Sequence, residues 1–345
     1  MIRDLTNRER EVLQFVVENF IRSALPIGSR SISKGTTLNL SSATIRNVMS
    51  DLEDMELLHT PHTSAGRIPT DKAYRYYVDI LMSDLHLNDK EKKLLENQIL
   101  EQKHRILENE DIYIETTKIL GKISHQLAII TKPFLDNAVF EKLEIVSLSS
   151  TKILVVISIS SGYAKTVLVE LEAEVPASKL DKLSQFLNER LQGLTLKEIR
   201  QSFDERVDDY KHEEPDLLKV FVNYKDEIYG SSDTGAVYIS GTGEIINQPE
   251  FDDPKNFKNI INLAEDKQLV VQIFKDASHN EDSLIISIGE ENPDSKLKDY
   301  SVLRTTYNIN DMKGNIGIIG PKRMDYAKMV SLLKYTSDLI NRIKF

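Results

Sequence analysis

Residues 41–56, SSATIRNVMSDLEDME, decide the fold of the N-terminal part of this chain. At about 100° per residue, the larger apolar side chains of a helix over this stretch fall on one side. They are Ile45, Val48, Met49 and Leu52. Ser41 or Ser42 is a suitable N-cap, because a serine hydroxyl can accept a hydrogen bond from a free amide of the first turn. The stretch therefore predicts a capped helix whose Ile45 side packs on a core.

The opposite side of this helix carries small or hydrogen-bonding residues. They are Ala43, Arg46, Asn47 and Ser50, with Ser42 and Thr44 at the margin. Arginine can bind guanine with two hydrogen bonds, asparagine can bind adenine, and a methyl group can contact thymine. The serines at the helix start can offer hydroxyls and amides to a phosphate. This face is therefore typical of a helix that reads the major groove of DNA.

The neighbouring segments complete a winged helix-turn-helix. A capping box at Thr6–Glu9 begins a first helix, and Pro26 and Gly28 end it. We expect Ser29 to cap a short second helix that runs to about Thr36. Residues 57–70 resemble two short strands around a polar tip. A helix, a short helix, a capped helix and a hairpin form this motif.

The hairpin supplies the remaining candidates for DNA contact. They are His62, Thr63, Ser64 and Arg67, and we expect them to lie along the DNA backbone or in the minor groove. From the second helix we add Ser29 and Arg30 to the predicted interface.

The net charge of −10 over 345 residues argues weakly against nucleic-acid binding. However, residues 1–80 hold ten basic and ten acidic residues, so the acidic excess lies elsewhere. Residues 19–50 and 57–70 contain no acidic residue. A DNA-binding face needs a local positive potential and not a basic protein. A trihelical interaction module with Arg46 and Asn47 simply facing solvent is the alternative, and the charge pattern favours DNA.

Composition excludes several other classes. The chain has no cysteine, which rules out disulfides and thiolate zinc sites and fits a reducing cytoplasm. The N-terminus has no apolar signal core and no apolar run is long enough to span a membrane, so we expect a cytoplasmic protein. His59 and His62 lack neighbouring metal-ligand partners, and no catalytic motif is present. We therefore expect no enzyme activity, no metal and no cofactor.

The rest of the chain alternates between helical and strand-like blocks. A charged linker helix spans about 86–110 and a more apolar helix 112–132. The expected later helices are 178–190, 196–202, 215–229 and 324–343. The expected strands are 143–148, 153–158, 164–171, 269–274, 284–288, 301–307 and 316–319, with a hairpin at 237–246. This order predicts an α+β multidomain protein in which one domain carries an insertion.

Several motifs resemble the HrcA family of heat-inducible transcription repressors. They are PIGSRSISK (26–34), SSATIRN (41–47), LEDMELL (52–58), PHTSAGRIPT (61–70), YRYYVD (74–79), ISIGEEN (286–292) and GNIGIIGPKRMDY (314–326). SSATIRN and HTSAGRIPT together are highly specific, whereas the middle of the chain identifies no family.

The resemblance implies a winged helix joined to a GAF-like α/β domain that an inserted dimerisation domain interrupts. On this chain the winged helix would span 1–84, the linker helix 85–104, the GAF-like domain 105–175 and 268–345, and the insertion 176–267. It further implies a homodimer that binds an inverted-repeat operator of chaperone operons. Repression would depend on a chaperonin and would be lost on heat stress.

Two other functions compete with this one. One is a metabolite-responsive repressor whose GAF-like domain binds a small ligand. The other is an enzyme with a DNA-binding regulatory domain, which would need a catalytic constellation in residues 105–345, and the sequence shows none there. Fold class alone does not decide between a ligand-binding and a ligand-free domain.

Overall fold

The computed structural model describes residues 4–36, 38, 40–61, 66–83, 87–101, 111–133, 135–160, 162, 164–230, 237–275, 284–309 and 312–342. The chain divides into two compact units. The first combines residues 1–130, 238–306 and 316–339, and the second combines 131–237, 307–315 and 340–345. Among the described residues, no helix combines the length and apolar character that crossing a membrane requires.

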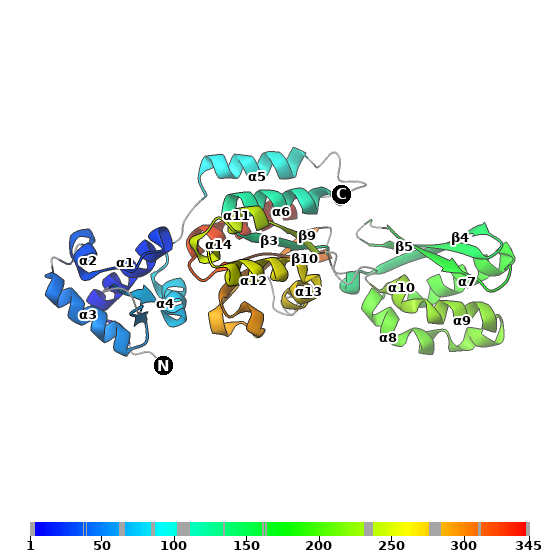
Figure 1. Cartoon of the computed structure of the whole chain (residues 1–345). Coiled ribbons are helices and arrows are strands. Elements are labelled where there is room, and N and C mark those ends of the chain that lie inside the picture. Colours follow the sequence, from blue (N-terminus) through cyan, green and yellow to red (C-terminus); the bar gives the residue numbers. More distant parts are fainter. Residues whose placement is uncertain are drawn as a thin grey trace. The chain divides into compact units, whose positions relative to one another are not determined.

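The N-terminal part of the first unit is a helical head with a small two-stranded sheet (Figure 1). Its elements are α1 (Asn7–Ser23), α2 (Ser29–Gly35), α3 (Ser42–Asp54), β1 (Leu58–His59), β2 (Ile68–Pro69), α4 (Asp71–Tyr76) and the π-helical turn η1 (Tyr77–Leu81). The Thr6 hydroxyl and the Glu9 carboxylate form the expected capping box at the start of α1. Val12, Leu13, Val16 and Val17 of α1 are buried and form the centre of the head.

The rest of the first unit is built on a five-stranded sheet with the order β7-β3-β10-β9-β8. The strands are β3 (Leu127–Thr131), β7 (Val237–Ser240), β8 (Ile285–Ile288), β9 (Tyr300–Ile309) and β10 (Met312–Pro321). Figure 1 shows α5 (Asp89–Glu101) and α6 (Asp111–Ser124) over one face, and α12 (Pro254–Glu265) and α13 (Lys267–Lys275) over the other. The short helix α11 (Thr242–Ile245) and the closing helix α14 (Tyr326–Asn341) complete it.

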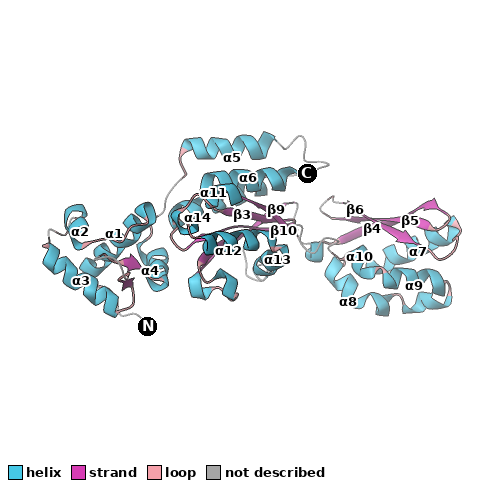
Figure 2. Cartoon of the chain, viewed as in Figure 1, coloured by secondary structure: helices cyan, strands magenta, loops and turns pink. Residues whose placement is uncertain are grey.

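The second unit has its own core. Its three-stranded antiparallel sheet runs β4 (Phe140–Ser149), β5 (Lys152–Ile159) and β6 (Ala164–Glu170). The helices α7 (Ala177–Leu191), α8 (Leu196–Arg206), α9 (Pro215–Asn223) and α10 (Lys225–Tyr229) lie on one face of this sheet (Figure 2). The Lys165 ammonium on β6 donates to the carbonyls of Glu227 and Ile228, which ties the sheet to the end of α10.

The strands β3 and β7 are neighbours in the five-stranded sheet, but residues 132–236 separate them along the chain. The predicted limits of the insertion, 176 and 267, do not coincide with this division. Strands β4–β6 share one hydrophobic cluster with α7–α10, whereas α12 and α13 belong to the first unit. A strand pattern in the sequence does not say which sheet the strand will join, because pairing is a long-range contact.

Three local predictions are wrong. Residues 269–274 form part of helix α13, because Asp266 caps the helix and the buried Leu269, Val270, Ile273 and Phe274 recur at helical spacing. A short apolar run fits a strand and a buried helix equally well from its pattern alone. Residues 127–131, expected at the end of a helix, form the fully buried strand β3.

The predicted hairpin at 237–246 is instead strand β7 followed by helix α11. Gly241 lies between them with a φ of +98°. A Cβ atom at this position would lie 2.0 Å from the Gln126 carbonyl oxygen, so the chain turns here against a neighbouring backbone. Glycine suits both the positive φ and the close approach.

Candidate nucleic-acid interface

The start of helix α3 is fixed by Ser41. Its hydroxyl accepts a hydrogen bond from the Thr44 amide at 3.1 Å and lies 2.9 Å from the Thr44 hydroxyl. Of the two possible N-caps, Ser41 is therefore the one used. Ser42 is the first helical residue and is half-buried.

The two sides of α3 differ as its periodicity predicts. Ile45, Met49 and Leu52 are buried, and Val48 is half-buried. Five of the proposed contact residues on the other side are exposed: Ala43, Thr44, Arg46, Asn47 and Ser50. This exposed face carries hydrogen-bonding groups and one positive charge, and it contains no acidic residue before Asp51.

Helix α2 packs against α3 and adds further polar groups beside it. The Ser33 hydroxyl donates to the Leu40 carbonyl at 2.8 Å, which holds the turn between the two helices. Arg30 is exposed and Ser29 is half-buried. The N-cap of α2 is Gly28 and not Ser29, because Ser29 already has helical geometry.

The hairpin of residues 57–70, which we call the wing, is attached to the rest of the head through backbone and side-chain contacts. Ile27 and Arg67 exchange two backbone hydrogen bonds of 2.9 Å, and Leu58 pairs with Pro69 in the antiparallel sheet β1–β2. The predicted contact residues His62, Thr63 and Ser64 lie outside the described residues.

Arg67 has a partner that the sequence did not indicate. Its Nε atom donates to the Glu53 carboxylate at 2.8 Å, and the Thr60 hydroxyl donates to the same carboxylate at 2.6 Å. These hydrogen bonds, the Thr60 bond first, lower the pKa of the Glu53 carboxyl despite partial burial. Glu53 therefore joins the last turn of α3 to the base of the wing. Nothing in the spacing of Glu53 and Arg67 reveals this contact, because it depends on how the hairpin folds back.

The head thus combines a helix with an exposed hydrogen-bonding face, a supporting helix and a hairpin anchored to that helix. Two family models match the chain, "Winged helix-turn-helix transcription repressor, HrcA DNA-binding" over residues 4–80 and "HrcA protein C terminal domain" over residues 110–330. The chain belongs to the HrcA family. Its N-terminal head is the winged helix-turn-helix of a heat-inducible transcription repressor.

Full-length relatives agree with this assignment. A heat-inducible transcription repressor HrcA from Chlorobium phaeobacteroides (strain BS1) is 40% identical over 99% of this chain and 99% of its own. The HrcA from Chlorobium chlorochromatii (strain CaD3) is 42% identical over 96% and 95% of the two chains. A solved structure described as a hypothetical protein has a TM-score of 0.59 at 18% identity, covering 99% of this chain and 98% of its own, which indicates a similar fold.

Proposed function

We propose that this HrcA family member binds an inverted-repeat operator of chaperone operons as a homodimer, and that a chaperonin maintains its active form. The observation that carries the proposal is the exposed face of α3, where Arg46 and Asn47 are exposed whereas Ile45 is buried. In helix-turn-helix proteins, the helix at this position enters the major groove and its N-terminal residues contact base edges.

The proposed roles of the site residues follow from their positions. Arg46 and Asn47 read bases, with Ala43, Thr44 and Ser50 beside them on the same face. Ser41, Ser42, Ser29 and Arg30 lie at or near the helix starts, where they approach the DNA backbone. Arg67, with its Nε held by Glu53, supports the wing and meets the backbone or minor groove, together with His62, Thr63 and Ser64.

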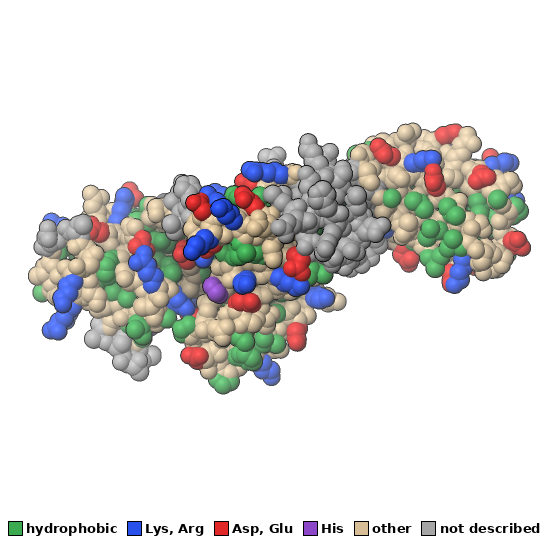
Figure 3. Space-filling model, turned by 90° about the horizontal axis from the view of Figure 1, so that it is seen from above, with side chains coloured by type: hydrophobic (Ala, Val, Ile, Leu, Met, Phe, Trp, Pro, Cys, Tyr) green, Lys and Arg blue, Asp and Glu red, His purple; other side chains and the backbone are tan. Residues whose placement is uncertain are grey.

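An apolar surface on the second unit supports the proposed dimer. Val146, Leu148 and Leu168 are 45%, 56% and 48% exposed, and Val146, Leu154 and Leu168 pair side by side across β4, β5 and β6. Figure 3 shows hydrophobic side chains gathered over this unit. We call this surface the outer sheet face. A contiguous exposed apolar patch marks an interaction site, and an inverted repeat calls for two related heads.

The order of the sheet strands along the sequence supports the proposed dependence on a chaperonin. In the five-stranded sheet, β3 can pair with its neighbours β7 and β10 only after residues 132–236 have been synthesised. Such non-local pairing is slow and leaves strand edges exposed during folding. We propose that this sheet, with helices on both faces, is a GAF-like domain interrupted by a dimerisation domain that the second unit supplies.

Binding titrations test the proposed function. Purified full-length protein, free of small molecules, is titrated against an inverted-repeat operator duplex and against a random duplex of equal length, at two salt concentrations. The proposal requires preference for the operator and a dimer stoichiometry. Equal binding to both duplexes would contradict operator recognition.

A further inference from the structure

Three stretches that resemble the HrcA family, YRYYVD (74–79), ISIGEEN (286–292) and GNIGIIGPKRMDY (314–326), contain no predicted DNA contact, yet the first unit brings them together. We infer that they form a latch that fixes the DNA-binding head on the five-stranded domain, and that the latch presets the orientation of the head. The coupling to operator binding rests on the proposed function, whereas the latch itself does not.

The centre of the latch is a forked ion pair between Arg75 on α4 and Glu291. Arg75 Nε donates to Glu291 Oε1 at 2.8 Å, and Nη2 donates to the other carboxylate oxygen and to the Ile286 carbonyl. Glu291 is held in place by the Ile288 amide, which donates to Oε2 at 2.8 Å. Paired hydrogen bonds between guanidinium and carboxylate give a defined geometry as well as energy, so this contact can fix an orientation.

A second ion pair flanks the first on the same helix. Asp71 Oδ1 lies 2.6 Å from Lys322 Nζ, and Asp71 Oδ2 accepts from the Glu290 amide at 3.3 Å. Gly289 lies directly beneath, with a φ of +57°, and a Cβ atom there would lie 1.8 Å from Asp71 Oδ2. Any other residue here would require the Asp71 carboxylate to move and would be strained by the positive φ, and glycine avoids both costs.

Arg323 makes the third polar contact, with a second helix of the head. Its Nη1 donates to the carbonyl of Ile21 in the last turn of α1, where the helix dipole favours a cation. Its Nη2 donates to Glu250 at 2.9 Å, so the guanidinium bridges the head and the loop before α12. The Arg323 side chain is only 12% exposed.

Aromatic packing fills the space between these polar contacts. The rings of Tyr74 on α4 and Tyr326 on α14 have centroids 5.9 Å apart, and both residues are buried. The Tyr326 hydroxyl donates to the Lys322 carbonyl at 2.7 Å and lies 2.8 Å from the Ser301 hydroxyl. Tyr326 therefore holds the segment that carries Lys322 and Arg323 against β9.

The latch uses α4 and the end of α1 and leaves the exposed face of α3 free. Arg46, Asn47 and Ser50 are exposed while Arg75 and Arg323 are engaged. The docked head therefore keeps the exposed face of α3 accessible to DNA. In a dimer, fixed heads lower the entropic cost of placing the second head on the second half-site. Opening the latch keeps each head intact and removes this advantage.

The absence of cysteine allows a direct test of the latch. Cysteines replace Lys34 on α2 and Lys258 on α12, both exposed, and carry spin labels for pulsed distance measurements on full-length protein. We expect a narrow distance distribution for the parent and a broad one for Glu291→Gln combined with Arg323→Gln. The control is Lys296→Gln, which removes an ion pair between Lys296 and Asp266, two residues outside the head, and should leave the distribution narrow. A broad parent distribution, or no broadening in the double variant, would overturn the latch.

The same variants separate the latch from the proposed function. The double variant should bind the complete operator about tenfold more weakly than the parent, with unchanged binding to a single half-site duplex. The exchanged pair Arg75→Glu with Glu291→Arg should recover part of the operator binding that Arg75→Glu loses alone. Equal loss on operator and half-site would contradict the latch, whereas a parent that does not prefer operator would contradict the proposed function and leave the distance test standing.

Discussion

Glu53 and Arg67 connect the last turn of the recognition helix to the base of the wing through a hydrogen bond of 2.8 Å. Their side chains are 32% and 20% exposed, so the pair is neither free in solvent nor fully buried. The two proposed DNA-contacting elements, α3 and the wing, therefore do not move independently. A change at Glu53 should affect the wing although Glu53 itself is not a proposed DNA contact.

We predict that Glu53→Gln loosens the wing in a pH-dependent way. The pKa of Glu53 is lowered in the folded chain, so its stabilising effect is present above the unfolded pKa of about 4.5 and is lost as the pH falls through the folded pKa. The Arg67 amide donates to the Ile27 carbonyl, and its hydrogen exchange at pH 7 should be faster in the variant than in the parent. The corresponding decrease in the free energy of opening should be less than about 1 kcal/mol. The difference between the two proteins should shrink below pH 4.5; a constant difference would show that the carboxylate charge is irrelevant.

We expect Arg46→Ala and Asn47→Ala to reduce discrimination between operator and random DNA. Loss of a bidentate base contact costs about 1–3 kcal/mol and relaxes specificity at one base pair. Titrations against both duplexes at fixed salt measure the ratio of affinities. Lys258→Ala, which removes one positive charge from the exposed surface of α12, serves as the control for net charge. Wild-type discrimination in folded Arg46 and Asn47 variants would refute their role as base readers.

Arg67→Ala should weaken binding to operator and random DNA by a similar factor. A contact to the backbone carries little sequence information, and losing it flattens the dependence of affinity on salt. The Glu53→Gln variant is the matched comparison, because it breaks the same ion pair and keeps the guanidinium. If Arg67→Ala reduces only operator binding, Arg67 reads sequence and the backbone assignment is wrong.

The outer sheet face yields a prediction for dimerisation. Leu168→Glu should convert a dimer into monomers and leave the secondary structure intact, because this side chain points away from the core that Val167 and Val169 form. Sedimentation velocity measures the change, and circular dichroism confirms folding. Leu25→Glu alters another exposed leucine, 66% accessible on the head, and should remain dimeric. A dimeric Leu168→Glu variant would place the interface elsewhere.

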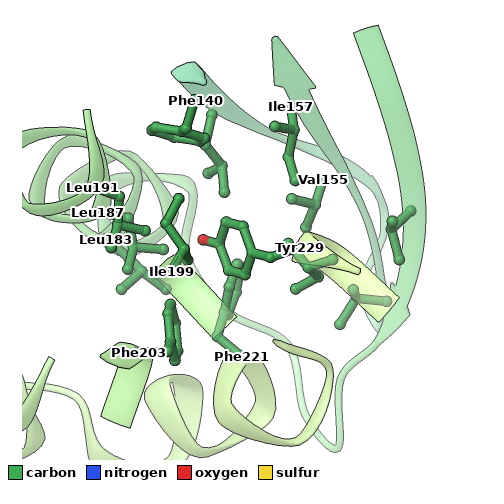
Figure 4. Close-up of a cluster of buried hydrophobic side chains, with 14 of the residues drawn as sticks. Phe140, Val155, Ile157, Leu183, Leu187, Leu191, Ile199, Phe203, Phe221 and Tyr229 are labelled. Carbon is green, nitrogen blue, oxygen red and sulfur yellow. The ribbon is translucent and has the colours of Figure 1, made fainter. Parts of the chain in front are cut away.

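Tyr229 provides a prediction for stability. It is fully buried at the centre of the hydrophobic cluster in Figure 4, and within the described part of the chain its hydroxyl has no hydrogen-bond partner. A buried unpaired hydroxyl costs about 1–3 kcal/mol, so Tyr229→Phe should raise the free energy of unfolding of the second unit by about that amount. Tyr326→Phe, which removes a bonded hydroxyl, should instead destabilise the protein in denaturant titrations. If the Tyr229→Phe variant is less stable than the parent, the Tyr229 hydroxyl has a hydrogen-bond partner in the folded protein.

Refolding tests the dependence on chaperonin. After dilution from denaturant, recovery of operator binding should be greater with chaperonin and ATP than without them, in buffer free of small metabolites. The reason is the delayed pairing of β3 with strands that lie more than a hundred residues later in the chain. Equal recovery in both conditions would remove the support for this partner.

Local sequence was sufficient where neighbouring residues determine structure. The Thr6–Glu9 capping box, the cap at Ser41 and the buried side of α3 all follow from hydrogen-bonding capacity and helical periodicity within a few residues. The strands β5 and β6 were likewise predictable, because their inward and outward residues alternate. The exposed face with Arg46 and Asn47 is a consequence of the same periodicity.

Tertiary structure decided what depends on distant partners. Residues 269–274 are a helix although their composition also fits a strand, and β4–β6 share a core with the helices that follow them. The contacts Glu53–Arg67 and Arg75–Glu291 join residues 14 and 216 positions apart. No local pattern encodes such pairs, because an ion pair forms wherever packing places two opposite charges, and the packing is a property of the whole folded chain.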